Sequence, residues 1–328
     1  MRCYKIRCEK DRRLNVKRGR NRPALFWRCG QALQADYLTD ETESSIKISY
    51  CICWLVVLRR LSDYDDIIKW KGGHIMKKQA VISAKHLKKS FGTKENVQTI
   101  YSDLNIDIYK GDFTVIMGSS GAGKSTLMYS LSGMDTPDGG QIDFDGTDIT
   151  KLSSDRLAVF RRSQCGFVFQ QIYLIDKMSL MDNVITAGVL TNRNKEDIRN
   201  RAEQLFSLVN IPEATWKKTS SQISGGEAQR AGIVRAVINH PNVLFADEPT
   251  GALNSANGTA VLDVFSSLHE KGQSIVMVTH DKKSALRGSR ILYIKDGKIF
   301  GECNLGKFEP DNAERAEKFE KFITEMGW

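Results

Sequence analysis

Residues 118–125 read Gly118-Ser119-Ser120-Gly121-Ala122-Gly123-Lys124-Ser125 and fit G-x-x-x-x-G-K-[ST], a loop pattern that holds nucleotide phosphates. An apolar run at 113–117 precedes the loop and a helix-compatible segment at 126–131 follows it, so the loop is expected to join a strand to a helix. Backbone N–H groups and the positive helix end then face one anion. We expect residues from Gly118 to Thr126 to hold the phosphates, Lys124 to reach the β- and γ-phosphates, and Ser125 to ligate Mg²⁺.

A second candidate site follows the short apolar run 243–246, which has the length and composition of a strand buried on both faces. Asp247 and Glu248 come directly after it. At the end of such a strand, Asp247 is expected to hold Mg²⁺ and Glu248 to polarise the attacking water. The alternative, two acidic residues that only lead into the turn at 249–251, is less favoured beside an intact phosphate loop.

A helix with a special beginning is predicted at Ser224. The segment Ile223-Ser224-Gly225-Gly226-Glu227-Ala228-Gln229-Arg230 precedes apolar residues at helical spacing. Ser224 can cap this helix, and a capped helix that begins at two glycines provides a second anion-binding end. A second end is useful if two chains meet head to tail and each offers it to the other's γ-phosphate. The segment resembles the signature of ATP-binding-cassette (ABC) ATPases, L-S-G-G-Q, with Ile223 in the first position.

The resemblance to ABC ATPases covers about residues 80–305 and implies further site residues. Phe91 matches the aromatic position that stacks on adenine. Gln170 matches the glutamine that senses Mg²⁺ and the attacking water, and His280 matches the switch histidine that contacts the γ-phosphate. The resemblance thus implies ATP and Mg²⁺ as ligands, with Glu248, His280 and Gln170 in catalysis, Ser125, Gln170 and Asp247 at the metal, and Phe91, Ser224, Gly225 and Gly226 on the nucleotide.

The segment after the turn at 249–251 departs from the family pattern. Asn254 stands where these proteins usually have an aspartate, in the segment that crosses their dimer interface. An amide forms hydrogen bonds but carries no charge. The departure concerns the coupling between the two sites of a dimer, and not the ability to bind ATP.

The fold expected from residue 76 onward is α/β, a P-loop NTPase of the ABC type with a mainly parallel sheet core, an N-terminal antiparallel strand region and an inserted helical subdomain. The Asp296-Gly297 pair predicts a hairpin within 290–300. The expected segments are a nucleotide-binding core at 76–170 and 224–305, a helical subdomain at 171–223 and a closing helix within 306–328.

The first 75 residues differ in charge from the rest. The whole sequence has 48 Lys and Arg against 39 Asp and Glu, a net charge of +9, and residues 1–75 hold 16 and nine of these, respectively. The remainder is nearly neutral, so its charge does not indicate a nucleic-acid partner. A zinc site at Cys51 and Cys53 and a basic arm for nucleic acid are less favoured interpretations of the segment.

We interpret residues 1–75 as an upstream mistranslation or a disordered extension. Lys71-Gly72-Gly73 would be encoded by purine-rich codons that can spell a bacterial ribosome-binding sequence, at the spacing that a start codon at Met76 needs. The family resemblance also begins just after Met76. The natural chain is therefore expected to start there. The sequence has no run of 18 apolar residues. If the chain serves a transporter, we expect the pore of that transporter to come from another protein.

The segments 158–162, 166–170 and 181–184 resemble the branch of lipoprotein-releasing, macrolide-exporting and antimicrobial-peptide (bacitracin-type) exporting ATPases. That resemblance implies a subunit at the cytoplasmic face of a bacterial membrane that powers a separate permease for a hydrophobic or peptide-like substrate. The permease is expected to dock beside Gln170. Two alternatives stay open: a regulatory ABC ATPase that drives a membrane activator of cell-wall hydrolysis in division, and a soluble non-transport ABC ATPase.

Overall fold

A six-stranded sheet with the order β12-β11-β5-β10-β9-β8 forms the central layer of the computed structural model, which describes residues 70–71, 74–75, 78–93 and 96–328. Neighbouring strands are parallel except at the β11–β12 edge. The strands are β5 (Phe113–Gly118), β8 (Cys165–Phe169), β9 (Val243–Asp247), β10 (Ser274–Val278), β11 (Arg290–Lys295) and β12 (Lys298–Asn304). Residues 1–69, and with them most of the predicted extension, lie outside the described residues.

A second, four-stranded sheet is antiparallel throughout and has the order β4-β3-β6-β7. Its strands are β3 (Ala80–Thr93), β4 (Asn96–Tyr109), β6 (Gly139–Phe144) and β7 (Thr147–Asp148), and a separate pair is formed by β1 (Trp70–Lys71) and β2 (His74–Ile75). The predicted α/β class, with a mainly parallel core and an antiparallel region, is confirmed. The predicted hairpin is confirmed too, since β11 and β12 meet at Asp296-Gly297, both with positive φ.

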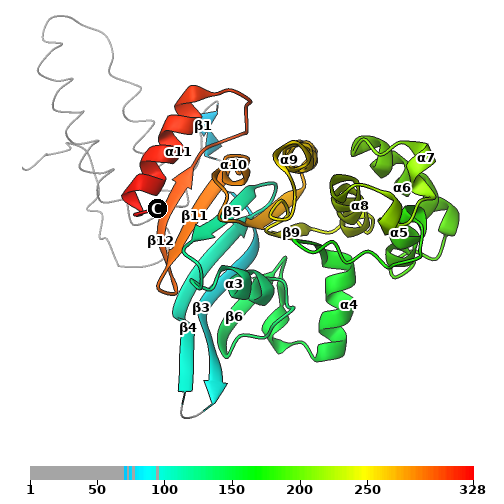
Figure 1. The fold of residues 1–328 in the computed structure, drawn as a ribbon. Coiled ribbons are helices and arrows are strands. Elements are labelled where there is room, and N and C mark those ends of the chain that lie inside the picture. The colour runs from blue at the N-terminus through cyan, green and yellow to red at the C-terminus, as the bar shows by residue number, and fades with distance from the viewer. Residues whose placement is uncertain (1–69, 72–73, 76–77, 94–95) are drawn as a thin grey trace, which may run out of the picture. The chain divides into compact units, whose positions relative to one another are not determined.

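Helices cover both faces of the central sheet (Figure 1). Alternate residues of β5 face opposite sides: Val115 belongs to the apolar cluster shared with α5, α6, α8 and α9, whereas Ile116 belongs to the cluster shared with α3 and the antiparallel sheet. The helices are α3 (Lys124–Leu131), α4 (Ser154–Gln164), α5 (Leu180–Gly188), α6 (Lys195–Leu208), α7 (Glu213–Trp216), α8 (Gly225–Val237), α9 (Ser255–Glu270), α10 (Lys282–Ala285) and α11 (Ala313–Glu325).

The helices between β8 and α8 form a group of their own. Helix α5 packs against α6, α7 and α8, and α6 also contacts α7 and α8 (Figure 1). The apolar residues Ile198, Ala202, Leu205 and Phe206 of α6 recur at helical spacing and are buried. Helix α8 in turn packs against β8, the strand that Gln170 follows.

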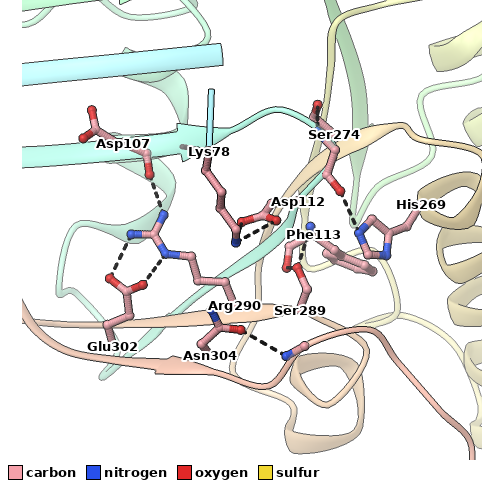
Figure 2. A network of polar contacts seen from close by, with 12 residues as sticks. Lys78, Asp107, Asp112, Phe113, His269, Ser274, Ser289, Arg290, Glu302 and Asn304 are labelled. Carbon is pink, nitrogen blue, oxygen red and sulfur yellow. Dashed lines mark hydrogen bonds and ion pairs between the residues drawn. The ribbon is translucent and has the colours of Figure 1, made fainter. Parts of the chain in front are cut away.

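Arg290 of β11 connects the two sheets (Figure 2). Its guanidinium forms a two-pronged ion pair with Glu302 on β12, with N–O distances of 2.6 and 2.8 Å, and donates to the backbone oxygen of Asp107 on β4. Nearby, Lys78 pairs with Asp112 at 2.8 Å, just before β5 begins. The first group of bonds joins β4 of the antiparallel sheet to β11, and the second joins the segment before β3 to the start of β5, the strand that carries the phosphate loop.

The closing helix α11 is fastened by one buried cation. The Arg315 side chain is only 6% exposed, and its guanidinium donates to five backbone oxygens. Two of them, from Leu286 and Gly288, belong to the segment after α10, and three belong to residues 305–307. A buried charge is tolerated only where such bonds satisfy it, so this cluster fixes α11 to the chain that follows His280.

Candidate functional site

The phosphate loop lies between β5 and α3, as the sequence predicts. Gly118 has φ 150° and Gly123 has φ 87°, and a Cβ at these positions would lie 2.2 Å from the Ile294 oxygen and 2.4 Å from Ile100 Cγ2, respectively. Both positions therefore require glycine. No side chain caps the N-terminus of α3 in the described structure, so its first N–H groups face the loop and are available to an anion.

Lys124 folds back over this loop. Its ammonium donates to the backbone oxygens of Gly118 (2.9 Å) and Ser119 (2.8 Å). Burial lowers the pKa of Lys124, and the nearby carboxylates of Glu248 and Asp247 oppose that shift. The phosphate loop and the predicted acidic pair are thus within electrostatic range of one another, although they are more than 100 residues apart in the sequence.

Asp247 faces α3 with both carboxylate oxygens. Ser125 Oγ donates to Asp247 Oδ1 at 3.0 Å, and the Tyr129 hydroxyl donates to Oδ2 at 2.8 Å. A hydroxyl and a carboxylate oxygen at this spacing are the hard oxygen ligands that Mg²⁺ takes, so these residues fit that cation. Tyr129 was not singled out in the sequence. Its only signal is a position four residues after Ser125, on the same face of the helix.

Glu248 and His280 lie in direct contact. The Glu248 Oε1 atom accepts from the His280 backbone N–H (3.0 Å) and lies 2.7 Å from His280 Nδ1, while Oε2 accepts from the Thr279 hydroxyl at 3.1 Å. Glu248 also has φ 47°, an uncommon left-handed conformation that its N–H bond to the Val278 oxygen (2.9 Å) helps to hold. In this conformation both carboxylate oxygens already have donors.

Gln170 follows β8 and lies against the turn after Glu248. A Cβ on Gly251 would come within 2.9 Å of Gln170 Nε2, so glycine leaves the space that this side chain uses. The buried Gln229 of α8 fixes the same region, because its amide nitrogen donates to the backbone oxygens of Phe169 and Pro249, each at 2.9 Å. The sequence pattern assigns no role to Gln229, because there it is one more polar residue in a helical pattern.

The N-terminus of α8 has the predicted serine cap. Ser224 Oγ accepts from the Glu227 N–H, and Glu227 Oε2 accepts from the Ser224 N–H at 2.9 Å, which completes a capping box. The bond from the Ser224 N–H first, and then a bond that the Ser224 hydroxyl donates to Glu227 Oε2 at 2.8 Å, lower the pKa of Glu227. Glu227 occupies the fifth position of the signature, where the family pattern has glutamine, and the box explains what a carboxylate does there.

Two groups of predicted nucleotide-binding residues have, among the described contacts, none with the acidic pair. Gly225 and Gly226 pack against Leu253 and Asn257, outside the described contacts of the phosphate loop. Phe91, on the long strand β3, is 47% exposed, and the Lys89 ammonium lies 5.0 Å from its ring centroid. An aromatic ring that is half exposed in this way can present a face to a base.

Asn254 caps α9: its Oδ1 accepts from the Asn257 N–H at 2.9 Å. We expect Asn254→Asp to keep this cap and to stabilise the fold by about 0.3–1 kcal/mol, because it adds a negative charge at a helix N-terminus. ATPase activity should be at least that of the parent chain. Thermal unfolding and steady-state ATPase assays check both points. An inactive variant with normal ATP affinity would instead indicate a dimer interface that depends on the amide.

The class of protein that this fold and site define is the ABC-type P-loop ATPases. A phosphate loop follows one parallel strand, an Asp-Glu pair ends the strand two places away, and a histidine after the strand between them contacts the glutamate. The ABC transporter family model matches residues 101–251. The chain belongs to the ABC transporter family.

Two relatives that differ in their own length support this membership. The chain is 38% identical over 222 residues to the macrolide export ATP-binding/permease protein MacB of Aggregatibacter actinomycetemcomitans. The aligned residues cover 68% of this chain and 34% of MacB. It is 39% identical over 219 residues to the ABC transporter ATP-binding protein MJ1508 of Methanocaldococcus jannaschii, covering 67% and 97%, respectively. The chain thus spans about a third of the MacB relatives that it matches.

A solved structure extends the likeness to three dimensions. The ATP-binding cassette MJ0796, in a dimeric post-hydrolysis state bound to ADP and Pi, superposes with a TM-score of 0.63 and 34% sequence identity. The match covers 69% of this chain and all of that one. A second dimeric structure of the same cassette gives a TM-score of 0.64.

Proposed function

We propose that this chain is the ATP-binding and ATP-hydrolysing subunit of a bacterial ABC transporter that works with a separate membrane permease. The observation that carries the proposal is the meeting of Lys124, Asp247 and Glu248 beside one glycine-rich loop. In this chain the loop and the Lys124 charge would bind the phosphates of ATP, with the Phe91 ring against the adenine. Ser125, Asp247 and Gln170 would hold Mg²⁺, which neutralises phosphate charge when bound.

Glu248 is the residue proposed to take the proton of the attacking water. Its carboxylate is held by Thr279 and His280, so His280 has to turn away before Oε1 can accept a water proton. The γ-phosphate offers His280 a stronger anionic partner, and ATP binding therefore supplies the reason for that turn. Gln170, which lies next to Gly251, would orient the water.

A second copy of the chain would complete each site. Ser224, Gly225 and Gly226 lie outside the contacts of their own phosphate loop, and Ser224 is exposed at the start of a capped helix. Offered to the ATP of another copy, this helix end would face the γ-phosphate. MJ0796, which matches over its whole length, is dimeric in two structures, and this likeness supports a head-to-tail dimer here.

The permease and its substrate are proposed from the relatives. Among the described residues no helix is long and apolar enough to cross a membrane. MacB is named as a macrolide export ATP-binding/permease protein, and this name supports a hydrophobic substrate of the macrolide type. The lipoprotein and antimicrobial-peptide types are proposed from the resemblance of the sequence segments alone. The chain would act at the cytoplasmic face of the membrane, with the permease seated beside Gln170 and the helices α5–α7.

Co-expression with the membrane proteins encoded beside this chain's gene tests the proposal. We expect a tag on this chain to recover a complex with two copies of the subunit and a higher ATPase rate per copy, because a permease holds two cassettes together. The same purification without the membrane protein is the control. Full-speed hydrolysis by the lone chain, with no membrane partner recovered, would favour a soluble ABC ATPase. A stimulated complex that moves no substrate in vesicles would favour the regulatory alternative.

A further inference from the structure

Two hydroxyls of the same helix hold the two oxygens of one carboxylate. Ser125 and Tyr129 lie four residues apart on α3 and so share one face of it. Ser125 Oγ donates to Asp247 Oδ1 at 3.0 Å, and the Tyr129 hydroxyl donates to Oδ2 at 2.8 Å. Each oxygen of Asp247 therefore has its own donor from the helix that follows the phosphate loop.

The Tyr129 bond fixes the orientation of the Asp247 carboxylate, which the Ser125 bond alone does not fix. The terminal torsion of an aspartate is broad, so a single hydrogen bond leaves the carboxylate free to rotate about its own axis. Two donors, one on each oxygen, fix the plane of the group. Tyr129 therefore determines which lone pairs of Oδ1 point toward Ser125 and the space beside it.

We propose that Tyr129 is a positioning residue for the divalent cation of the ATP site, acting through Asp247. The inference rests on the proposed function, in which Ser125 and Asp247 hold Mg²⁺. Tyr129 bonds the oxygen opposite to the one that faces Ser125, so it orients the carboxylate without competing for the oxygen nearest the cation. Partners of this kind, which hold a metal-binding carboxylate from behind, typically change metal affinity by about 10- to 100-fold when they are removed.

Packing alone does not explain the hydroxyl. The Tyr129 ring lies beside the apolar cluster of α3 and the antiparallel sheet, and a phenylalanine ring would fill the same space. The hydroxyl extends beyond that cluster to a carboxylate 118 residues away in the sequence. Tyr129→Phe therefore removes the positioning bond and keeps the packing.

The test compares nucleotide binding with and without the cation. ATP affinity is measured by calorimetry for the full chain in saturating Mg²⁺ and in EDTA, and Mn²⁺ affinity for the ADP complex by electron paramagnetic resonance. We expect Tyr129→Phe to weaken Mn²⁺ binding and to reduce the Mg²⁺-dependent gain in ATP affinity by about 10-fold or more. Affinity in EDTA should stay unchanged, because the phosphate loop is untouched.

Tyr101→Phe is the matched control. The Tyr101 hydroxyl lies 2.7 Å from Ser130 Oγ, so this change also removes a tyrosine bond to α3 but leaves Asp247 alone. Its cation dependence should equal that of the parent chain. In an Asp247→Asn background, Tyr129→Phe should have no further effect on the cation dependence, since the two residues act as one unit.

Three outcomes would overturn the proposal. A Tyr129→Phe chain with the parental cation dependence would show that the hydroxyl does not position the carboxylate. Equal losses in Tyr129→Phe and Tyr101→Phe would assign the effect to the packing of α3. A parent chain whose ATP affinity does not depend on Mg²⁺ would overturn the proposed metal site itself, and this third outcome is recognised without any variant.

Discussion

Replacement of Glu248 by glutamine is expected to slow ATP hydrolysis by about 10²–10⁴-fold, the usual contribution of a general base. An amide keeps the size of the side chain, and its one oxygen can still accept from the His280 N–H while its NH2 group faces the Thr279 hydroxyl, but it cannot take a proton from water. ATP binding, which depends on the phosphate loop, should remain intact. Single-turnover hydrolysis and equilibrium binding of ATP measure the two effects separately.

The slow variant should also accumulate as an ATP-bound dimer, because the state that normally ends with hydrolysis then persists. Sizing chromatography at saturating ATP measures this population. Glu320→Gln is a matched control: its carboxylate pairs with Lys282, close to His280 in the sequence, but lies on the exposed face of α11. It should hydrolyse ATP normally. A Glu248→Gln chain that binds ATP and stays monomeric would contradict the head-to-tail arrangement.

Lys124→Ala should instead weaken ATP binding by about 10²-fold or more, as expected when one partner of a desolvated charge pair is removed. The ammonium already lies over the loop, bonded to two backbone oxygens, so phosphate binding needs only a short movement of it. Calorimetric titration with ATP measures the change. The variant should form no ATP-dependent dimer.

Lys151→Ala provides the control for lost positive charge, since Lys151 pairs with Asp148 at the surface, in the helical turn after β7. Its ATP affinity should be that of the parent. If Lys124→Ala kept nearly full affinity, the loop 118–125 would not be the phosphate site, and the proposed function would lose the observation that carries it.

Local motifs predicted the fold class and the placement of the phosphate loop, because their geometry is encoded by adjacent residues. Gly118 and Gly123 adopt backbone angles that other residues avoid, and β9 is buried on both faces as its apolar run predicted. The Ser224 cap and the Asp296-Gly297 hairpin were predictable for the same reason. Each of these features depends on residues a few positions apart.

The contacts that organise the site were not predictable in this way. Tyr129 meets Asp247 across 118 residues, and Gln229 joins Phe169 to Pro249, because strand order and register bring these positions together. The order β5-β10-β9 places Thr279 and His280, after β10, between the phosphate loop and Glu248. No local spacing encodes that order. The roles of the predicted site residues in binding ATP and Mg²⁺ and in hydrolysis, those of Phe91, Gln170 and Ser224 among them, stay predictions.

The anchoring of α11 by Arg315 affects the order in which a newly translated chain can fold. Translation proceeds from the N-terminus at about 5–20 residues per second, so every candidate site residue is made before Arg315. The backbone oxygens of Leu286 and Gly288 are therefore synthesised on the order of seconds before Arg315, which donates to them. In each newly made chain the phosphate loop has therefore been synthesised at a stage when the segment after His280 still lacks its bonds to Arg315.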